Sequence, residues 1–351
     1  MTAWQPFVSV IIPTYNRASR LRATVESFNA QRYPTDRFEI IIVDNASTDE
    51  TPQQIASLVE EFPHVRRMRE RRRGAHWARN AGATVSLGEI LYFTDDDMIA
   101  DPDLLAKIVE PFSMDVNVGS ATGRVLPSWE TEPPVWVLQH LRNALLSLND
   151  RGDALIISDD DPGVFSCHLA ILRDVFFRAG GFNPDTNAGE FVGDNETGLN
   201  IKVRKLGYSF AYVGESVTHH MIPASRMTQA YLNSRFADQG FCDSYTDYRA
   251  IRPGPLKLLR RVAANGVLTA ATVSKAAARR VTGNSRWRVD LARLFYYRNR
   301  ARYDLRLLLH EQWRTFALQD DWITDDARTY TFPTEGQGEK RRQGEQGSGT
   351  E

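Results

Sequence analysis

Short apolar runs and helical spacings of apolar residues alternate along the first hundred positions. Val8–Ile12 and Glu39–Val43 are β-branched runs with the pattern of buried strands. Between them, Arg17–Gln31 carries Leu21, Val25 and Phe28 at helical spacing. A strand, a helix and a strand within about 40 residues form a βαβ unit, which predicts a parallel sheet with a right-handed crossover.

The same pattern continues further along the chain. It predicts helices over 51–62 and 75–87, a central strand over 89–93, and later strands over 120–125, 165–172 and 209–213. We therefore expect an α/β fold whose mixed, mainly parallel sheet is flanked by helices.

The composition changes after Pro253-Gly-Pro255. Arg, Ala, Leu and Val then dominate, and helices are expected over 256–281 and 286–316. From about residue 335 the chain lacks apolar anchors and is expected to be disordered. These changes predict a sheet domain at 1–251, a basic helical extension at 252–332 and a tail at 333–351.

The overall composition is that of a globular protein. Of 351 residues, 42% are hydrophobic and 25% charged, which excludes a collagen-like, coiled-coil or wholly disordered chain. Two cysteines exclude a disulfide framework and favour a reducing cytoplasm. The first residues lack the pattern of a signal peptide, and the uncharged run Val262–Ser274 is too short to span a bilayer.

The net charge of −1 conceals a basic segment. Residues 252–302 hold 13 Lys and Arg against one acid. Such a segment attracts anionic surfaces, either phospholipid headgroups or nucleic acid. The alternative is that its arginines dock on the acidic body of the same chain, and the sequence does not decide between the two.

Polar residues directly follow the first two predicted strands. In open α/β sheets ligands bind at these carboxyl ends, so Thr14, Tyr15 and Asn16 are candidates to line a nucleotide pocket, and Asp44 to accept from a base or ribose. The alternative for Asp44 and its neighbours is an ordinary turn and helix cap.

Three adjacent carboxylates, Asp95, Asp96 and Asp97, follow the 89–93 strand. Like charges this close disfavour ionisation unless a cation neutralises them. Oxygen ligands in this number suit Mg²⁺ or Mn²⁺ bound jointly with a diphosphate. The alternative is a solvated acidic loop.

In combination, VSVIIPTYNR, VDNASTDET, RGAHWARNAG and YFTDDDM resemble the N-terminal half of a family 2 glycosyltransferase with the GT-A fold, over about residues 6–240. The resemblance implies that Pro13–Asn16 and Asp44 hold the base and ribose of a nucleotide sugar. It also implies that Asp97 binds the metal, with Asp95 contacting the ribose and Asp96 completing the acidic motif.

RGAHWARNAG resembles the family segment that runs beneath the nucleotide. There Gly74 allows close approach of the backbone, Arg79 faces phosphate or the acidic cluster, and Asn80 fixes the loop. The preceding stretch Arg66–Arg73 contains six arginines and is interpreted as an exposed basic loop.

Two further roles follow from the resemblance. The acids that open a helix near residue 196 supply the general base, with Glu196 as first candidate and Asp194 as its competitor. A histidine after the 209–213 strand meets the metal or the departing diphosphate, and alignment through Ile222-Pro223 favours His220. The alternative is a buried histidine with a purely structural role.

The expected function is inverting, metal-dependent transfer of a sugar from a nucleotide-diphosphate sugar, with a UDP-sugar as first guess, to a saccharide or lipid-linked hydroxyl acceptor in polysaccharide or glycolipid synthesis. The basic helices would attach a cytoplasmic enzyme peripherally to the inner face of the membrane. Two alternatives are weaker. A nucleotidyltransferase or dehydrogenase would place a Gly-rich loop after the first strand, and a non-enzymatic binder of nucleic acid or of an anionic surface leaves the acids unexplained. We therefore expect no nucleic-acid partner.

Overall fold

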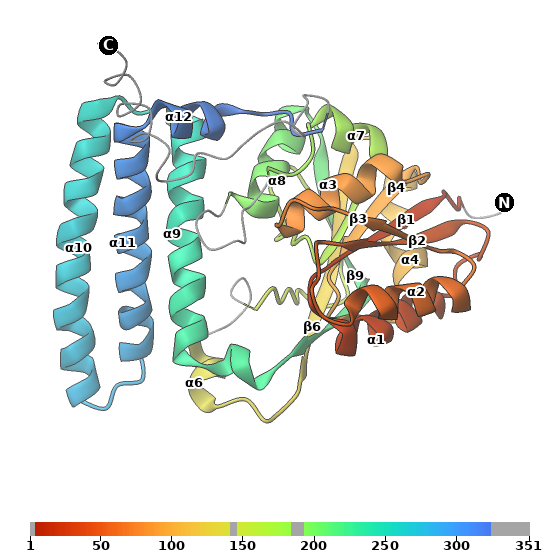
Figure 1. The fold of residues 1–351 in the computed structure, drawn as a ribbon, viewed down its shortest axis with the longest axis horizontal. Coiled ribbons are helices and arrows are strands. Elements are labelled where there is room, and N and C mark those ends of the chain that lie inside the picture. The colour runs from red at the N-terminus through yellow and green to blue at the C-terminus, as the bar shows by residue number, and fades with distance from the viewer. Residues whose placement is uncertain (1–3, 141–145, 184–192, 324–351) are drawn as a thin grey trace, which may run out of the picture.

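A computed structural model describes residues 4–140, 146–183 and 193–323. Its centre is a nine-stranded mixed sheet flanked by helices, so the predicted fold class is confirmed (Figure 1). The strands are β1 (Val8–Thr14), β2 (Phe38–Asp44), β3 (Val65–Arg69), β4 (Ile90–Thr94), β5 (Met98–Ala100), β6 (Val118–Trp129), β7 (Leu155–Ser158), β8 (His168–Leu172) and β9 (Ser209–Ile222).

The strand order is β3-β2-β1-β4-β8-β6-β9-β5, with β7 paired to β9. Strands β3, β2, β1 and β4 are parallel neighbours, and β8 joins β4 in the antiparallel sense. Thr14 pairs with Asp44 in the register of β1 and β2. The carboxyl ends of the parallel strands therefore meet at one edge, as the βαβ pattern predicts.

The helices are α1 (Ala18–Asn29), α2 (Thr51–Glu61), α3 (Ala75–Val85), α4 (Leu104–Ile108), α5 (Glu110–Met114), α6 (Val135–His140), α7 (Arg173–Arg178), α8 (Asn195–Lys205), α9 (Gln229–Ile251), α10 (Pro255–Val281), α11 (Trp287–Leu309) and α12 (Glu311–Leu318). In Figure 1, α9, α11 and α10 stand side by side at increasing distance from the sheet. Among the described residues, no helix is long and apolar enough to cross a membrane.

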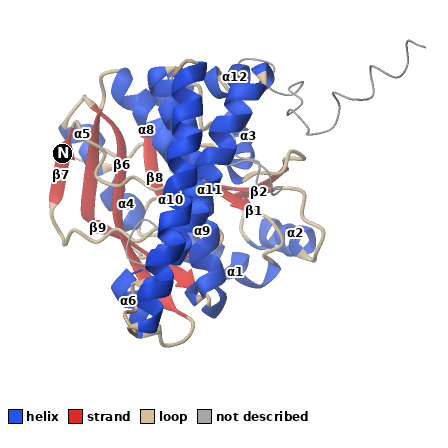
Figure 2. Ribbon diagram, turned by 90° about the vertical axis from the view of Figure 1, so that its left-hand side faces the viewer, coloured by secondary structure: helices blue, strands red, loops and turns tan. Residues whose placement is uncertain are grey.

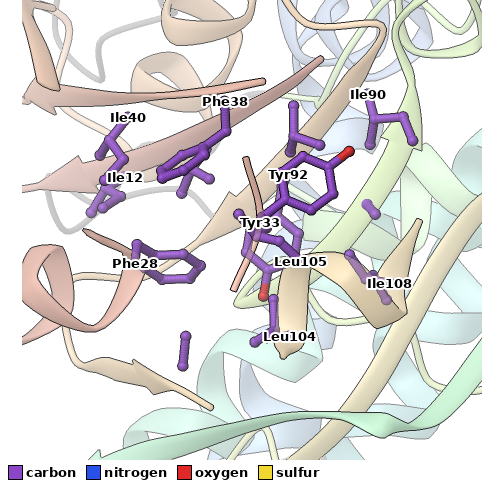
Figure 3. Packing of buried hydrophobic residues seen from close by; sticks show 14 of the residues in the cluster. Ile12, Phe28, Tyr33, Phe38, Ile40, Ile90, Tyr92, Leu104, Leu105 and Ile108 are labelled. Atoms are coloured by element: carbon purple, nitrogen blue, oxygen red, sulfur yellow. The ribbon is translucent and has the colours of Figure 1, made fainter. Parts of the chain in front are cut away.

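Apolar side chains on both faces of the sheet form the core. On one face Ile12, Phe28 and Tyr92 pack with residues of α4 (Figure 3). On the other face Ile11 packs against α3, where a Cβ added to Gly82 would lie 2.5 Å from Cγ2 of Ile11. This close approach of α3 holds the start of that helix against the carboxyl edge of the sheet.

Three predicted elements differ from the structure. Part of the stretch Arg66–Arg73, interpreted as a loop, is the edge strand β3. Exposed arginines are tolerated on an edge strand, and here they hide the alternation of apolar and polar residues that indicates a strand. The 286–316 helix breaks at His310, where Trp313 turns into a cluster with Tyr303. The last predicted strand continues to Ile222 because β6 runs parallel to it throughout.

Two parts of the sequence prediction lie outside the described residues. They are residues 324–351, which hold the end of the predicted extension and the tail, and residues 189–192, which precede the candidate bases Asp194 and Glu196.

Candidate active site

A cleft of about 340 Å³ opens at the carboxyl edge of the parallel strands. It is lined by Pro13, Thr14, Tyr15, Asn45, Gly74, Ala75, Arg79, Asp95, Asp96, Asp97, Arg17, Arg73 and Arg226. Most of the residues predicted at the first and third strand ends thus share one cavity, whereas Asp44, predicted at the second, does not line it. Acidic side chains from one strand end face arginines from four other segments across it.

Asp96 forms the floor of the cleft. Its Oδ2 accepts a 2.7 Å hydrogen bond from the hydroxyl of Thr14 at the end of β1. Burial and the negative charge of Asp97 raise the pKa of Asp96 to about 7, against the opposing effect of the Thr14 hydrogen bond. The side chain joins two strand ends and is 8% exposed.

Asp97 faces His220 and Arg226. Its Oδ1 lies 3.6 Å from Nε2 of His220, and its Oδ2 accepts a 2.9 Å bond from Arg226. Burial alone would raise the pKa of Asp97, but its contacts with His220 and Arg226 outweigh burial, so the net shift is downward. Alternation along β9 buries His220 and turns His219 outward to Asp101.

The donor atoms of this group suit a divalent cation. Nδ1 of His220 lies 2.8 Å from the carbonyl oxygen of Leu146 and donates to it, which leaves the Nε2 lone pair directed at the guanidinium of Arg226. A carboxylate and an imidazole lone pair therefore already converge on one positive group. Among the described residues no three acidic, histidine or cysteine side chains converge as a complete ligand set.

Asp95 points to another partner. Its carboxylate accepts a hydrogen bond from the buried guanidinium of Arg79, which also contacts Nδ1 of His76 at 3.1 Å. Asp95, Asp97 and His220, the predicted metal ligands, are therefore divided between two arginines. Arg79 faces the acidic cluster, one of the two positions expected for it.

The two candidate bases have different surroundings. Glu196, in the first turn of α8, is partly exposed and accepts a 3.3 Å hydrogen bond from Ser166. Burial raises its pKa, while the charges of Arg79 and Arg235 act in the opposite direction. Asp194 is 1% exposed and accepts a 2.7 Å bond from Asn183, and its pKa is also raised by burial. Glu196 is thus the more exposed of these two residues, and neither of them lines the cleft.

Several predicted residues build the loops around the cleft instead of lining it. The side chain of Asn16, a residue at φ 52°, donates a hydrogen bond to the hydroxyl of Thr48 and accepts one at 2.8 Å from the backbone N–H of Thr48. Asp44 accepts from the backbone of Ser47 at 2.9 Å. Asn80 holds both backbone groups of Phe182. Gly74, which does line the cleft, directly precedes α3 at φ 142°, a conformation that favours glycine.

Comparison with known proteins agrees with this site. Residues 9–177 match the model of glycosyl transferase family 2. The glucosyl-dolichyl phosphate glucuronosyltransferase of Haloferax volcanii is 25% identical over 247 residues, which is 68% of this chain and 77% of the relative. Residues 9–177 of this chain are a glycosyltransferase family 2 domain.

Two further similarities give the extent of the likeness. The glycosyltransferase AglE of Haloferax volcanii is 37% identical over 114 residues, 32% of this chain and 38% of the relative. The mannosyltransferase PcManGT of Pyrobaculum calidifontis, solved with GDP-Man and Mn²⁺, superposes with a TM-score of 0.57 at 24% identity, covering 86% of this chain and 88% of its own. The second likeness supports the GT-A fold of this glycosyltransferase.

Four residues of the transferase cleft were not singled out from the sequence. Asn45 accepts from the backbone of Gly74 at 2.7 Å and donates to the carbonyl of Arg72 at 2.6 Å, tying β2 to α3. Arg73 covers the ring of Tyr15 at 4.3 Å, and Arg17 and Arg226 complete the cationic wall. The position of Asn45 one residue after a buried strand was an available signal, but nothing local to Arg226 indicates the cleft.

Proposed function

We propose that this glycosyltransferase moves a sugar from a nucleotide-diphosphate sugar to an acceptor hydroxyl, with a divalent metal and with inversion at the anomeric carbon. The observation that carries the proposal is the single cleft in which Asp95–Asp97 face Arg17, Arg73 and Arg226. Acids that hold a cation and arginines that pair with phosphate oxygens are the two requirements of a diphosphate site.

The nucleotide lies over the ends of β1 and β2. Tyr15 offers an aromatic face, already covered by Arg73, and the backbone at Gly74 permits close approach. Pro13–Tyr15 line the donor pocket directly, and Asn16, Asp44 and Asn80 hold its walls. A UDP-sugar is the first donor to test, and GDP-mannose is the second because the PcManGT structure contains it.

Asp97 and His220 would hold Mn²⁺ or Mg²⁺, joined by the donor's phosphate oxygens. A bound divalent ion would stabilise the negative charge that develops on the leaving diphosphate. When the metal takes its place beside Asp97 and His220, the guanidinium of Arg226 would pair with the negative charge of the diphosphate. Asp95 stays with Arg79 and orders the loop that faces the donor sugar.

Glu196 acts as the general base. The acceptor oxygen forms a bond to the anomeric carbon while the bond from that carbon to the diphosphate oxygen breaks, and the hydroxyl proton passes to the Glu196 carboxylate. A raised pKa makes that carboxylate a better proton acceptor. Asp194, buried against Asn183, supports the start of α8 instead.

The acceptor we propose is a lipid-linked saccharide, as in polysaccharide or glycolipid synthesis at the cytoplasmic face of a membrane. The support is the Haloferax relative, whose name gives a sugar on dolichyl phosphate as its acceptor. We assign transfer to residues 1–251 and attachment to the helical extension at 252–332.

A thermal-shift panel tests the donor site. UDP-, GDP- and dTDP-sugars are compared with and without Mn²⁺, because a ligand that binds only the folded state raises its stability with affinity. We expect one nucleotide sugar to raise the Tm by several degrees only when Mn²⁺ is present. No shift with any donor in either condition would contradict the proposal.

A further inference from the structure

The polarity of α10 is the reverse of that expected for a surface helix. Its most buried residues, apart from Leu258 and Ala276, are Asn265 and Thr272. Its large apolar side chains lie in solvent: Leu256 is 62% exposed, Leu259 53%, Val267 70%, Val273 49% and Val281 88%. A helix that packs on a globular body normally buries its apolar stripe and exposes its polar one.

The inner face of α10 is held to its neighbours by polar contacts. Arg261 bonds to Asp304 of α11 at 3.0 Å and to Asp247 of α9 at 3.2 Å. Arg279 bonds to the buried Asp290 of α11 at 2.5 Å. These pairs attach the helix, and part of the basic segment does dock on acids of its own chain. The exposed apolar residues of α10 take no part in this attachment.

The exposed apolar residues follow the side of α10 that points away from the protein. At 100° per residue, Leu256, Val267 and Val281 lie roughly opposite Leu258 and Thr272. Alanines fill the positions between them, and residues 262–274 carry no charge. Figure 2 shows α10 in front of α11 and α9, so no other described element covers this side. We call Leu256, Leu259, Val267 and Val281, with Lys257 and Arg260, the outer face.

The charges around the outer face restrict what can cover it. Within residues 252–302, all of which the structure describes, exposed cations include Arg252, Lys257, Arg260, Arg280 and Arg286, and the single acid, Asp290, is 1% exposed. A second copy of this chain would bring cations against cations, which is unfavourable. Nucleic acid would satisfy the cations but would gain nothing from an apolar stripe.

We propose that the outer face of α10 binds the surface of an anionic lipid bilayer. Leu256, Leu259, Val267 and Val281 enter the boundary between headgroups and acyl chains, and Lys257 and Arg260 lie against anionic headgroups near the start of the helix. The helix would lie in the plane of the membrane. This proposal depends on α10 alone and is independent of the transfer reaction.

Flotation of the full chain with vesicles tests the proposal. We compare phosphatidylcholine vesicles with vesicles that contain a third phosphatidylglycerol, and expect binding at least tenfold stronger to the second. Val267→Glu should weaken binding at least tenfold by placing a charge in the apolar stripe, and Lys257→Glu with Arg260→Glu should do the same by reversing the attraction. Val116→Glu is the matched control, since Val116 is an 86% exposed valine far from α10 in the sequence, and its binding should not change.

Three results would overturn the proposal. The first is wild-type protein that floats with neither vesicle. The second is binding that Lys257→Glu with Arg260→Glu abolishes but Val267→Glu leaves intact, since this indicates a purely electrostatic partner such as nucleic acid. The third is self-association in sedimentation velocity that Val267→Glu removes, since this assigns the face to a second copy. The nucleotide-sugar thermal shift of each variant should equal that of wild type, so loss of vesicle binding and failure of the donor site are separable.

Discussion

At the cleft, polar groups at the strand ends have partners within the chain, whereas several large apolar side chains of α10 are exposed to solvent. Asp97 lies against His220 and Arg226, and Asp95 lies against Arg79. Val267 and Val281 stand in solvent while Asn265 and Thr272 are buried. Both regions place residues against the usual preference for polar outside and apolar inside.

The two regions differ in the kind of partner that their unusually placed residues require. Buried acids at the cleft are neutralised by arginines. A metal would in part replace these arginines and a diphosphate would pair with them, so this region is suited to small ions. The outer face of α10 is too long and too apolar for a small ligand and requires a surface. The two exceptions thus indicate two partners, and separate changes should affect each partner alone.

The largest effect is expected at Asp97. Asp97→Asn keeps the shape of the side chain but removes the charge that His220 and Arg226 balance, and the account predicts a loss of transfer of about 10⁴-fold, equivalent to about 5 kcal/mol. Vesicle binding should stay at the wild-type value. Initial rates of nucleotide release measure the loss, and a variant within tenfold of wild type would refute the role of Asp97.

A pair of variants separates the candidate bases. Glu196→Gln should lower kcat about 10³-fold with donor affinity unchanged, because only the proton acceptor is lost. Asp194→Ala should lower the free energy of unfolding by about 1–3 kcal/mol, because it leaves Asn183 buried without its partner. If Asp194→Ala lost kcat at unchanged stability while Glu196→Gln stayed active, the two roles would be exchanged.

Acid should destabilise the sheet more than the outer helices. His168 is fully buried between Tyr92 and the carbonyl of Ser216, and burial lowers its pKa from 6.5 to about 4. Above pH 6.5 it is neutral in both states. As the pH falls from 6.5 to about 4, only the unfolded state takes up the proton, so the free energy of unfolding should decrease by about 3 kcal/mol.

Urea unfolding at several pH values measures the slope, and His168→Gln should flatten it. Residues 255–309 contain no histidine, so α10 and α11 carry no equivalent group. A native His168 imidazole that titrates near pH 6.5 by NMR would contradict this account.

The smallest effect is expected at Arg226. Its guanidinium competes with a metal for Asp97 and His220, so Arg226→Ala should bind Mn²⁺ about tenfold more tightly in the absence of nucleotide, while kcat/KM falls about tenfold because the diphosphate loses a cation. Calorimetric titration with Mn²⁺ alone measures the first change. Weaker Mn²⁺ binding in the variant would show that Arg226 does not occupy the position of the metal.

The sequence predicts those elements and site residues that are determined by neighbouring residues along the chain. Val8–Ile12 and Glu39–Val43 are apolar runs with polar residues directly behind them, and parallel pairing brings Thr14 and Asp96 to one edge without further information. The Asp-rich strand end follows from the same logic of strand ends. His220 is indicated only by the family resemblance, because the strand predicted over 209–213 ends before it.

The remainder depends on contacts between distant segments. Arg226 reaches Asp97 only because β9 continues past Val213 to Ile222, which pairing with β6 imposes. The orientation of α10 has a similar cause: its apolar positions are visible in the sequence, but the acids of α9 and α11 decide which side of the helix faces inward. The break at His310 has no Gly or Pro to announce it.

The most direct measurement of the central claim is a titration of Mn²⁺ followed by electron paramagnetic resonance, with UDP and with GDP, on wild type and Asp97→Asn. The account predicts that one nucleotide diphosphate and the wild-type protein together remove the free Mn²⁺ signal at micromolar concentration, and that Asp97→Asn abolishes this effect. Equal loss of the signal in the variant, or none beyond that caused by nucleotide alone in wild type, would contradict it.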